Sequence, residues 1–127
     1  MGHIGLMPQT VRGKFRYKGK TDLEKKKLLK DSKSLEDAGV FAIVLECVER
    51  KLSREITESI NIPTIGIGSS NFCDGQILVT DDLLGLTDTK IKFVKKYADL
   101  KGSVKNAVKK FKLEVKKGSY PSIKYSY

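Results

Sequence analysis

A continuous apolar run in the first half of the chain constrains the fold more than any other feature. The run Val40-Phe41-Ala42-Ile43-Val44-Leu45 is apolar throughout and lacks the alternation of apolar and polar residues that marks a half-exposed strand. Runs of this kind are typical of strands covered on both faces, which occur almost only in parallel sheets flanked by helices. The run therefore predicts a buried parallel strand in an α/β fold.

Helical and strand patterns alternate around this run. Thr21 predicts the N-cap of a helix that ends at Gly39, and apolar residues at helical spacing predict a second helix over residues 52–60. Short apolar runs predict further strands over residues 64–68 and 76–79. Successive strand–helix–strand units favour a parallel sheet with helices outside it, and this pattern leaves both a doubly wound sheet and a barrel open.

The basic C-terminal part has its own pattern. Residues 90–127 hold twelve lysines against two acidic residues and account for the whole net charge of +10. Apolar residues recur there every three or four positions, which predicts amphipathic helices, split near residues 100–103, that pack an apolar stripe against a core. The stripe consists of Phe93, Tyr97, Leu100, Val104, Ala107, Val108, Phe111 and Val115. Nucleic-acid binding through the lysines is the alternative, and the absence of a base-reading motif disfavours it.

Length and composition limit the remaining possibilities. With 127 residues the chain is too short for a closed eight-stranded α/β barrel, which needs about 250. We predict one partial domain over residues 1–127, in which residues 90–127 form the basic helices.

No run approaches the roughly 18 apolar residues of a membrane span and no basic segment opens a secretory signal, so we expect a cytoplasmic protein without membrane contact. Cys47 and Cys73 have neither disulfide-framework nor zinc-site spacing and are predicted to be reduced, buried thiols.

Glu46 directly follows the apolar run and is the leading candidate for catalysis. It lies at the carboxyl end of the predicted central strand, where parallel α/β folds gather their ligand-binding groups. A carboxylate partly shielded from water at such a position is suited to act as a general base near neutral pH. The structural alternative is a salt-bridged carboxylate at a strand end.

Three further residues are candidates for ligand binding. Gly66 and Gly68 end the next predicted strand, where paired glycines either let the backbone approach a ligand or form a tight turn. They lack the third glycine of a dinucleotide site and the lysine of a phosphate-binding loop. His3, the only histidine, is flanked by Gly2 and Gly5 and is predicted to lie on a constrained turn, either as a ligand-binding group or as a solvated side chain.

A set of short motifs runs through the chain in a definite order. The motifs are Gly2-His3-Ile4-Gly5-Leu6-Met7-Pro8-Gln9, Val44-Leu45-Glu46-Cys47-Val48, Ile62-Pro63-Thr64-Ile65-Gly66-Ile67-Gly68, Asp74-Gly75-Gln76-Ile77-Leu78-Val79, Asp82-Leu83-Leu84-Gly85, Lys92-Phe93-Val94-Lys95-Lys96-Tyr97-Ala98-Asp99-Leu100 and Gly118-Ser119-Tyr120-Pro121. Their order and spacing, more than any single motif, resemble the ketopantoate hydroxymethyltransferase family. The resemblance covers essentially the whole chain.

The resemblance implies a fold, an activity and a set of site residues. The fold would be the C-terminal half of a TIM-type (β/α)8 barrel, with residues 1–89 as the half barrel and additional C-terminal helices. The activity would be hydroxymethyl transfer from methylenetetrahydrofolate to α-ketoisovalerate, which makes ketopantoate for pantothenate biosynthesis. Glu46 would be the proton acceptor, and His3, Gly66 and Gly68 would contact the substrate. A divalent metal, Mg²⁺ or another, would have its ligands in the missing N-terminal half, so no metal ligand is expected in this chain.

The sequence leaves more than one partner and more than one function open. The chain is expected to need the missing N-terminal half or a second copy, and the family implies a homo-oligomer. A noncatalytic remnant or binding module without the metal site is the main alternative, and nucleic-acid binding is less favoured. The segment from Phe15 to Gly19 departs from the usual family sequence and is two residues shorter, so its effect on the site is left open.

Overall fold

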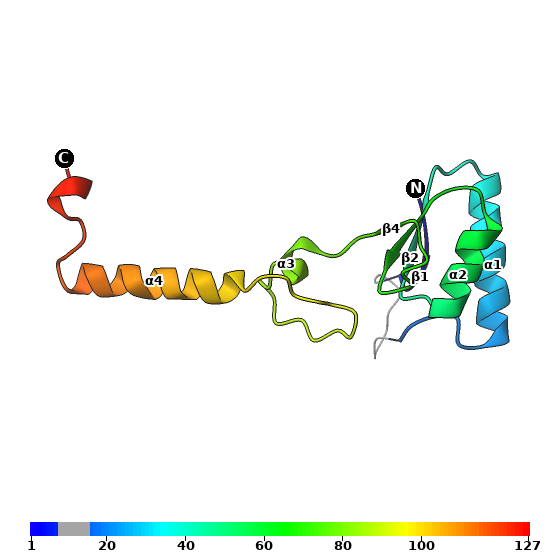
Figure 1. Ribbon diagram of the computed structural model, residues 1–127, viewed down its shortest axis with the longest axis horizontal. Helices are drawn as coiled ribbons and strands as arrows, with labels where there is room; N and C mark the ends of the chain where they lie inside the picture. The colour runs from blue at the N-terminus through cyan, green and yellow to red at the C-terminus, as the bar shows by residue number, and fades with distance from the viewer. Residues whose placement is uncertain (8–15) are drawn as a thin grey trace. The chain divides into compact units, whose positions relative to one another are not determined.

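The computed structural model describes residues 1–7 and 16–127 and divides the chain into two compact units (Figure 1). Unit 1 comprises Met1–Leu78, and unit 2 comprises Val79–Tyr127. Pro8, at the end of the predicted N-terminal turn, and Phe15, in the altered segment, lie outside the described residues.

Unit 1 is built on a parallel sheet of four short strands. The strands stand in the sheet in chain order: β1 (Gly2–Gly5), β2 (Ile43–Glu46), β3 (Thr64–Ile67) and β4 (Gly75–Gln76). Because all four strands run in the same direction, their carboxyl ends lie at one edge of the sheet. The prediction of an α/β fold with a parallel sheet is confirmed.

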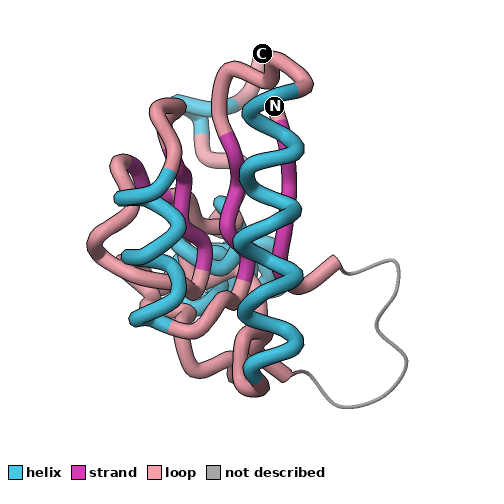
Figure 2. Tube along the Cα trace, turned by 90° about the vertical axis from the view of Figure 1, so that its right-hand side faces the viewer, coloured by secondary structure: helices cyan, strands magenta, loops and turns pink. Residues whose placement is uncertain are grey.

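Two helices, α1 (Asp22–Asp37) and α2 (Arg50–Ser59), lie side by side on the same face of this sheet (Figure 2). The Thr21 hydroxyl caps α1 by accepting the N–H of Glu24 at 3.2 Å. The Glu24 carboxylate in turn accepts the N–H of Lys20 at 2.9 Å, and this bond holds the pKa of Glu24 below its usual value. Gly39, with φ of 79°, follows the helix end. Both helix predictions are confirmed.

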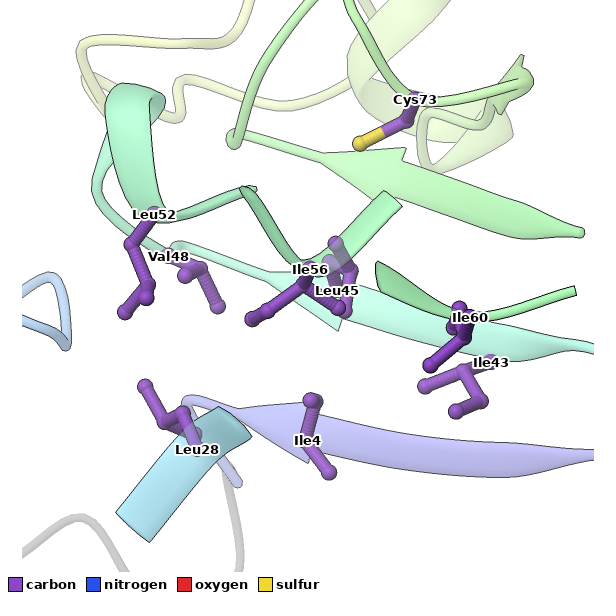
Figure 3. Close-up of a cluster of buried hydrophobic side chains, with 9 residues drawn as sticks. All are labelled: Ile4, Leu28, Ile43, Leu45, Val48, Leu52, Ile56, Ile60 and Cys73. Atoms are coloured by element: carbon purple, nitrogen blue, oxygen red, sulfur yellow. The ribbon is translucent and has the colours of Figure 1, made fainter. Parts of the chain in front are cut away.

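The core lies between the sheet and the two helices (Figure 3). Ile43 and Leu45 of β2 and Ile56 of α2 have no solvent exposure. The buried cluster consists of Ile4, Leu28, Ile43, Leu45, Val48, Leu52, Ile56, Ile60 and Cys73. Cys47 and Cys73 are free and buried, as predicted. Burial of these aliphatic side chains is the main favourable contribution to the stability of unit 1.

Only one face of β2 is covered within unit 1, so the prediction of burial on both faces is wrong for this unit. Side chains alternate along a strand, so the burial of Ile43 and Leu45 on the helix side directs Val44 and Glu46 to the other face. Among the described residues of unit 1, no helix lies on that face. We call it the open face; by strand register it consists of His3, Val44, Glu46, Ile65 and Ile67.

The strand bounds also differ from those predicted. β2 begins at Ile43, and Phe41, predicted to be buried in the strand, is 69% exposed. His3 lies in β1, so its predicted position on a turn is wrong; the glycine-rich segment becomes a strand because it pairs along β2. β4 has only two residues, and Ile77, in the predicted strand 76–79, is half exposed.

Unit 2 contains α3 (Thr80–Leu83), α4 (Leu100–Lys116) and a short 3₁₀ helix, η2 (Ile123–Tyr125). Gly85 has φ of 70°, and a side chain there would collide with the Ala98 carbonyl oxygen. The adjacent Tyr97 N–H donates to the Leu83 carbonyl at 2.8 Å, which joins the end of α3 to the segment before α4.

The basic C-terminal part forms one helix, α4, instead of the predicted helices split near residues 100–103. Asp99 caps it by accepting the N–H of Gly102 at 2.9 Å, so the helix starts where the split was predicted. None of its residues is buried, and Val108 is 61% exposed, so the predicted packing of its apolar stripe does not occur within unit 2. No helix among the described residues is long and apolar enough to cross a membrane.

The assigned core predicts that truncation of two leucines on the helices changes the free energy of unfolding by different amounts. Leu52→Ala should lower the free energy of unfolding by about 2–5 kcal/mol, because Leu52 is 1% exposed and its truncation leaves a cavity. Leu23→Ala is the matched control, since Leu23 is 81% exposed and its loss should cost less than about 0.5 kcal/mol. Urea denaturation followed by circular dichroism measures both. Equal losses would contradict the assigned core.

Candidate active site at the carboxyl end of the sheet

Glu46 is the last residue of β2 and belongs to the open face. In register it stands beside Gly5 of β1 and Ile67 of β3, which are the last residues of their strands. The structure therefore places the predicted base at the carboxyl edge of the parallel sheet, where side chains from neighbouring strands converge. Its side chain is 15% exposed, so the carboxylate is shielded from most of the solvent while remaining on the open face.

His3 and Glu46 form a side-chain pair on the open face. His3 Nε2 lies 3.1 Å from Glu46 Oε2 and 3.2 Å from the Leu6 carbonyl oxygen. Both neighbours are hydrogen-bond acceptors, so Nε2 must carry a proton and donate it. Glu46 Oε2 thus lies against a hydrogen-bond donor, and the pair joins β1 to β2 on the open face.

The backbone around Glu46 is tied to three other segments. Its carbonyl accepts the N–H of Leu6 at 2.8 Å, from the end of β1. The N–H of Cys47 donates to the Ile67 carbonyl at 2.9 Å, and the Cys47 carbonyl accepts the N–H of Lys18 at 2.8 Å. The two peptide groups that follow the candidate base are therefore fixed by hydrogen bonds to separate parts of unit 1.

Cys47, directly after the candidate base, has a left-handed backbone conformation. Its φ of 51° makes it the one non-glycine residue with positive φ among residues 1–7 and 16–127. A left-handed non-glycine residue costs roughly 1–2 kcal/mol, and such residues cluster where a site requires a sharp change of direction. Burial, reinforced by the neighbouring Glu46 carboxylate, raises the pKa of the Cys47 thiol to about 11. The thiol is therefore protonated near neutral pH.

The two glycines of the predicted ligand site occupy different environments. Gly66 lies on the helix side of β3, where a side-chain carbon would lie 2.9 Å from the amide of Gln76 and 3.2 Å from Cys73 Sγ. This crowding gives a structural reason for glycine at that position. Gly68, with φ of 64°, turns the chain just after the end of β3. A role of either glycine in substrate binding stays a prediction.

A cavity of about 510 Å³ lies between β1 and α1. It is lined in part by His3, Lys18, Lys27, Asp31 and Leu35. Glu46 does not line this cavity. We therefore assign the candidate active site to the open face, where Glu46 lies, and not to the cavity.

The side chains that the structure describes do not provide a metal centre. In residues 1–7 and 16–127, no three His, Cys, Asp or Glu side chains come together in a way that could hold a metal ion. His3 and Glu46 supply two potential ligands, and their contact at 3.1 Å occupies one oxygen of Glu46. The described residues therefore do not fit a metal site of their own, and no chemical step is assigned to a metal here.

Sequence reasoning named Glu46 and His3 as candidates but did not predict the contact between them. The position of Glu46 was readable because the apolar run before it ends at a charged residue. The pairing with His3 depends on the register of β1 beside β2, which no local pattern encodes. The left-handed turn at Cys47 was also unreadable, since glycine or asparagine would normally signal it.

The raised pKa of Cys47 predicts low thiol reactivity in the folded chain. The shift from 9.0 to about 11 leaves roughly a hundredfold less thiolate at pH 8, and the thiolate is the reactive form. Alkylation of Cys47 by iodoacetamide should thus be at least about a hundredfold slower than in urea. Glu46→Gln should speed alkylation by removing a negative charge that disfavours the thiolate, whereas Glu55→Gln on α2 should not. Mass spectrometry of the Cys47 peptide measures the rates, and equal rates in folded and unfolded chains would contradict the environment described.

Comparison with known proteins identifies the family to which the chain belongs. The family model described as ketopantoate hydroxymethyltransferase matches residues 1–123. The chain is 53% identical to the 3-methyl-2-oxobutanoate hydroxymethyltransferase of Pelagibacter ubique over 127 residues, which are all of this chain and 49% of that protein. Enzymes of the same name from Clostridium botulinum (strain Loch Maree / Type A3) and Pyrobaculum neutrophilum are each 51% identical over 100% and 96% of this chain, and over 47% and 48% of their own lengths. The chain thus spans about half the length of these relatives, and it belongs to the ketopantoate hydroxymethyltransferase family.

Proposed function

We propose that the chain supplies the proton-accepting half of a ketopantoate hydroxymethyltransferase. The reaction would join the methylene carbon of methylenetetrahydrofolate to the carbon next to the ketone of α-ketoisovalerate. The bonds from the methylene carbon to the folate nitrogens would break, one water would supply the hydroxyl group, and the products would be ketopantoate and tetrahydrofolate. The observation that carries this proposal is the placement of Glu46 at the carboxyl edge of the sheet, with Oε2 3.1 Å from His3 Nε2. Membership of the ketopantoate hydroxymethyltransferase family supports the same reaction.

Glu46 is suited to the proton transfer that this reaction requires. The carbon next to the ketone of α-ketoisovalerate must lose a proton before it can attack the methylene carbon of the folate. In our proposal Glu46 Oε1 takes this proton, and the electron pair of the C–H bond becomes the nucleophile for the new C–C bond. The side chain of Glu46 is only 15% exposed, so bulk water has limited access to the carboxylate that would accept the proton.

His3 has a supporting role in this proposal. Its Nε2 lies 3.1 Å from Glu46 Oε2 and 3.2 Å from the Leu6 carbonyl oxygen, so the ring is held against the end of β1. In our proposal this contact limits rotation of the carboxylate and leaves Oε1 to accept the proton. Gly66 and Gly68 would contribute through the backbone at the end of β3, where the chain turns beside the site.

The open face requires a cover that unit 1 does not contain. Val44, Ile65 and Ile67 are only half-buried there, and parallel sheets normally have both faces covered. We propose that the four strands are one half of a (β/α)8 barrel and that the missing N-terminal half closes it over this face. That half would also supply the divalent metal site, Mg²⁺ or another, that the family implies. The N-terminal half is therefore proposed as the partner, with a second copy of this chain as the alternative.

Complementation tests the half-barrel proposal. The chain should show no ketopantoate formation alone, and activity should appear when it is co-expressed with the N-terminal half of the Pelagibacter relative, in the presence of Mg²⁺ and methylenetetrahydrofolate. Ketopantoate is measured by mass spectrometry. Full activity of the chain alone would contradict the proposal, and no activity in any combination would favour a noncatalytic remnant.

Substitution of the base tests the assigned chemistry. In the active assembly, Glu46→Gln should reduce kcat by about 10²–10⁴-fold, because the amide cannot accept the proton. Binding of α-ketoisovalerate, measured by calorimetry, should change little because the amide is nearly isosteric. Glu55→Gln on α2 is the control and should keep normal turnover. Near-normal turnover of Glu46→Gln would remove Glu46 from the mechanism.

A further inference from the structure

A side chain from the loop after β3 also forms hydrogen bonds with the backbone around Glu46. The Ser69 hydroxyl donates to the Leu45 carbonyl at 2.6 Å and accepts the N–H of Val48 at 3.0 Å. These two backbone groups lie on either side of Glu46 and Cys47. A single hydroxyl thus bridges the chain immediately before and immediately after the candidate base.

The turn that this hydroxyl bridges requires outside support. Cys47 adopts its left-handed conformation, with φ of 51°, without the freedom that glycine has. A conformation of this kind persists only where surrounding contacts determine it. The bonds from Ser69 supply such contacts on both sides of Cys47, and they come from a loop distant in the sequence.

The hydrogen bonds of Ser69 indicate that its hydroxyl positions the backbone and does not bind the substrate. A serine hydroxyl has one proton, and Ser69 gives it to the Leu45 carbonyl. The hydroxyl therefore has no second proton to donate to a substrate while the turn is intact. Its effect on the site must pass through the backbone that carries Glu46.

We propose that Ser69 is a positioning residue, whose hydroxyl fixes the turn after β2 and thereby holds the Glu46 carboxylate against His3 on the open face. The catalytic consequence rests on the proposed function, whereas the structural consequence is a property of this chain alone. The next residue offers a matched control. Ser70 is buried, and its hydroxyl accepts only the N–H of Phe72, at 3.2 Å, within the same loop.

The first experiment uses the full chain without a partner half. Ser69→Ala should speed hydrogen exchange of the Val48 amide roughly five- to tenfold, because one hydrogen bond to that amide is lost. It should also shift the ring NMR signals of His3, the only histidine, toward their positions in Glu46→Gln. Ser69→Thr, which keeps a hydroxyl, should restore both signals, and Ser70→Ala should leave both near those of the unchanged chain. His3 signals that stay unchanged in Ser69→Ala while Val48 exchanges faster would overturn the positioning role.

The second experiment uses the complemented assembly. Ser69→Ala should lower kcat roughly tenfold or more while KM for α-ketoisovalerate stays within about twofold, because displacement of the base affects the chemical step more than binding. Ser69→Thr should recover most of the loss. Unchanged kcat in Ser69→Ala would overturn the proposal. If no assembly is active, the proposed function fails, and the His3 and Val48 signals of the chain alone still decide the role of Ser69.

Discussion

The burial of Ile43 and Leu45 against α1 and α2 is the constraint on which the rest of the structure depends. Side chains alternate strictly along a strand, so the burial of these two residues sends Glu46 to the opposite face of the sheet. A slip of one residue would place the carboxylate in the aliphatic core and an isoleucine or leucine on the open side. The hydrophobic core thus determines the direction of the candidate base before any polar contact forms.

Polar contacts then refine what the core has determined. His3 reaches Glu46 because β1 pairs with β2 in a register that places both residues on the open face. The bonds from Leu6 and Ile67 fix the peptide groups around the carboxylate. These contacts come from β1, from the residue that follows it and from β3, so the arrangement exists only in the assembled sheet. This dependence explains how a site with two facing side chains can be built from strands of four residues or fewer.

The sequence predicted best those elements that depend on residues close together in the chain. The N-cap at Thr21 and the apolar run before Glu46 predicted one helix and the central strand, because capping and burial both act over a few residues. β1 was not predicted, since a glycine-rich segment of four residues becomes a strand only through its neighbour. The apolar stripe of α4 was readable, but the surface that it packs against was not, because a periodic pattern does not name its partner. The role of Ser69 depends on the same non-local pairing and left no signal in the sequence.

The connection between β3 and β4 has a consequence for how this fold can vary. Parallel strands are usually joined by a dozen residues or more, commonly through a helix, but here residues 68–74 suffice because β4 is only two residues long. With no helix in this link, Cys73 fills the core beside Gly66, and Ser69, four residues earlier, bonds to the end of β2. The same seven residues therefore contribute both to the hydrophobic core and to the carboxyl edge of the sheet. Insertions or deletions that most surface loops tolerate would here disturb both together, which makes this link one of the least adjustable segments of unit 1.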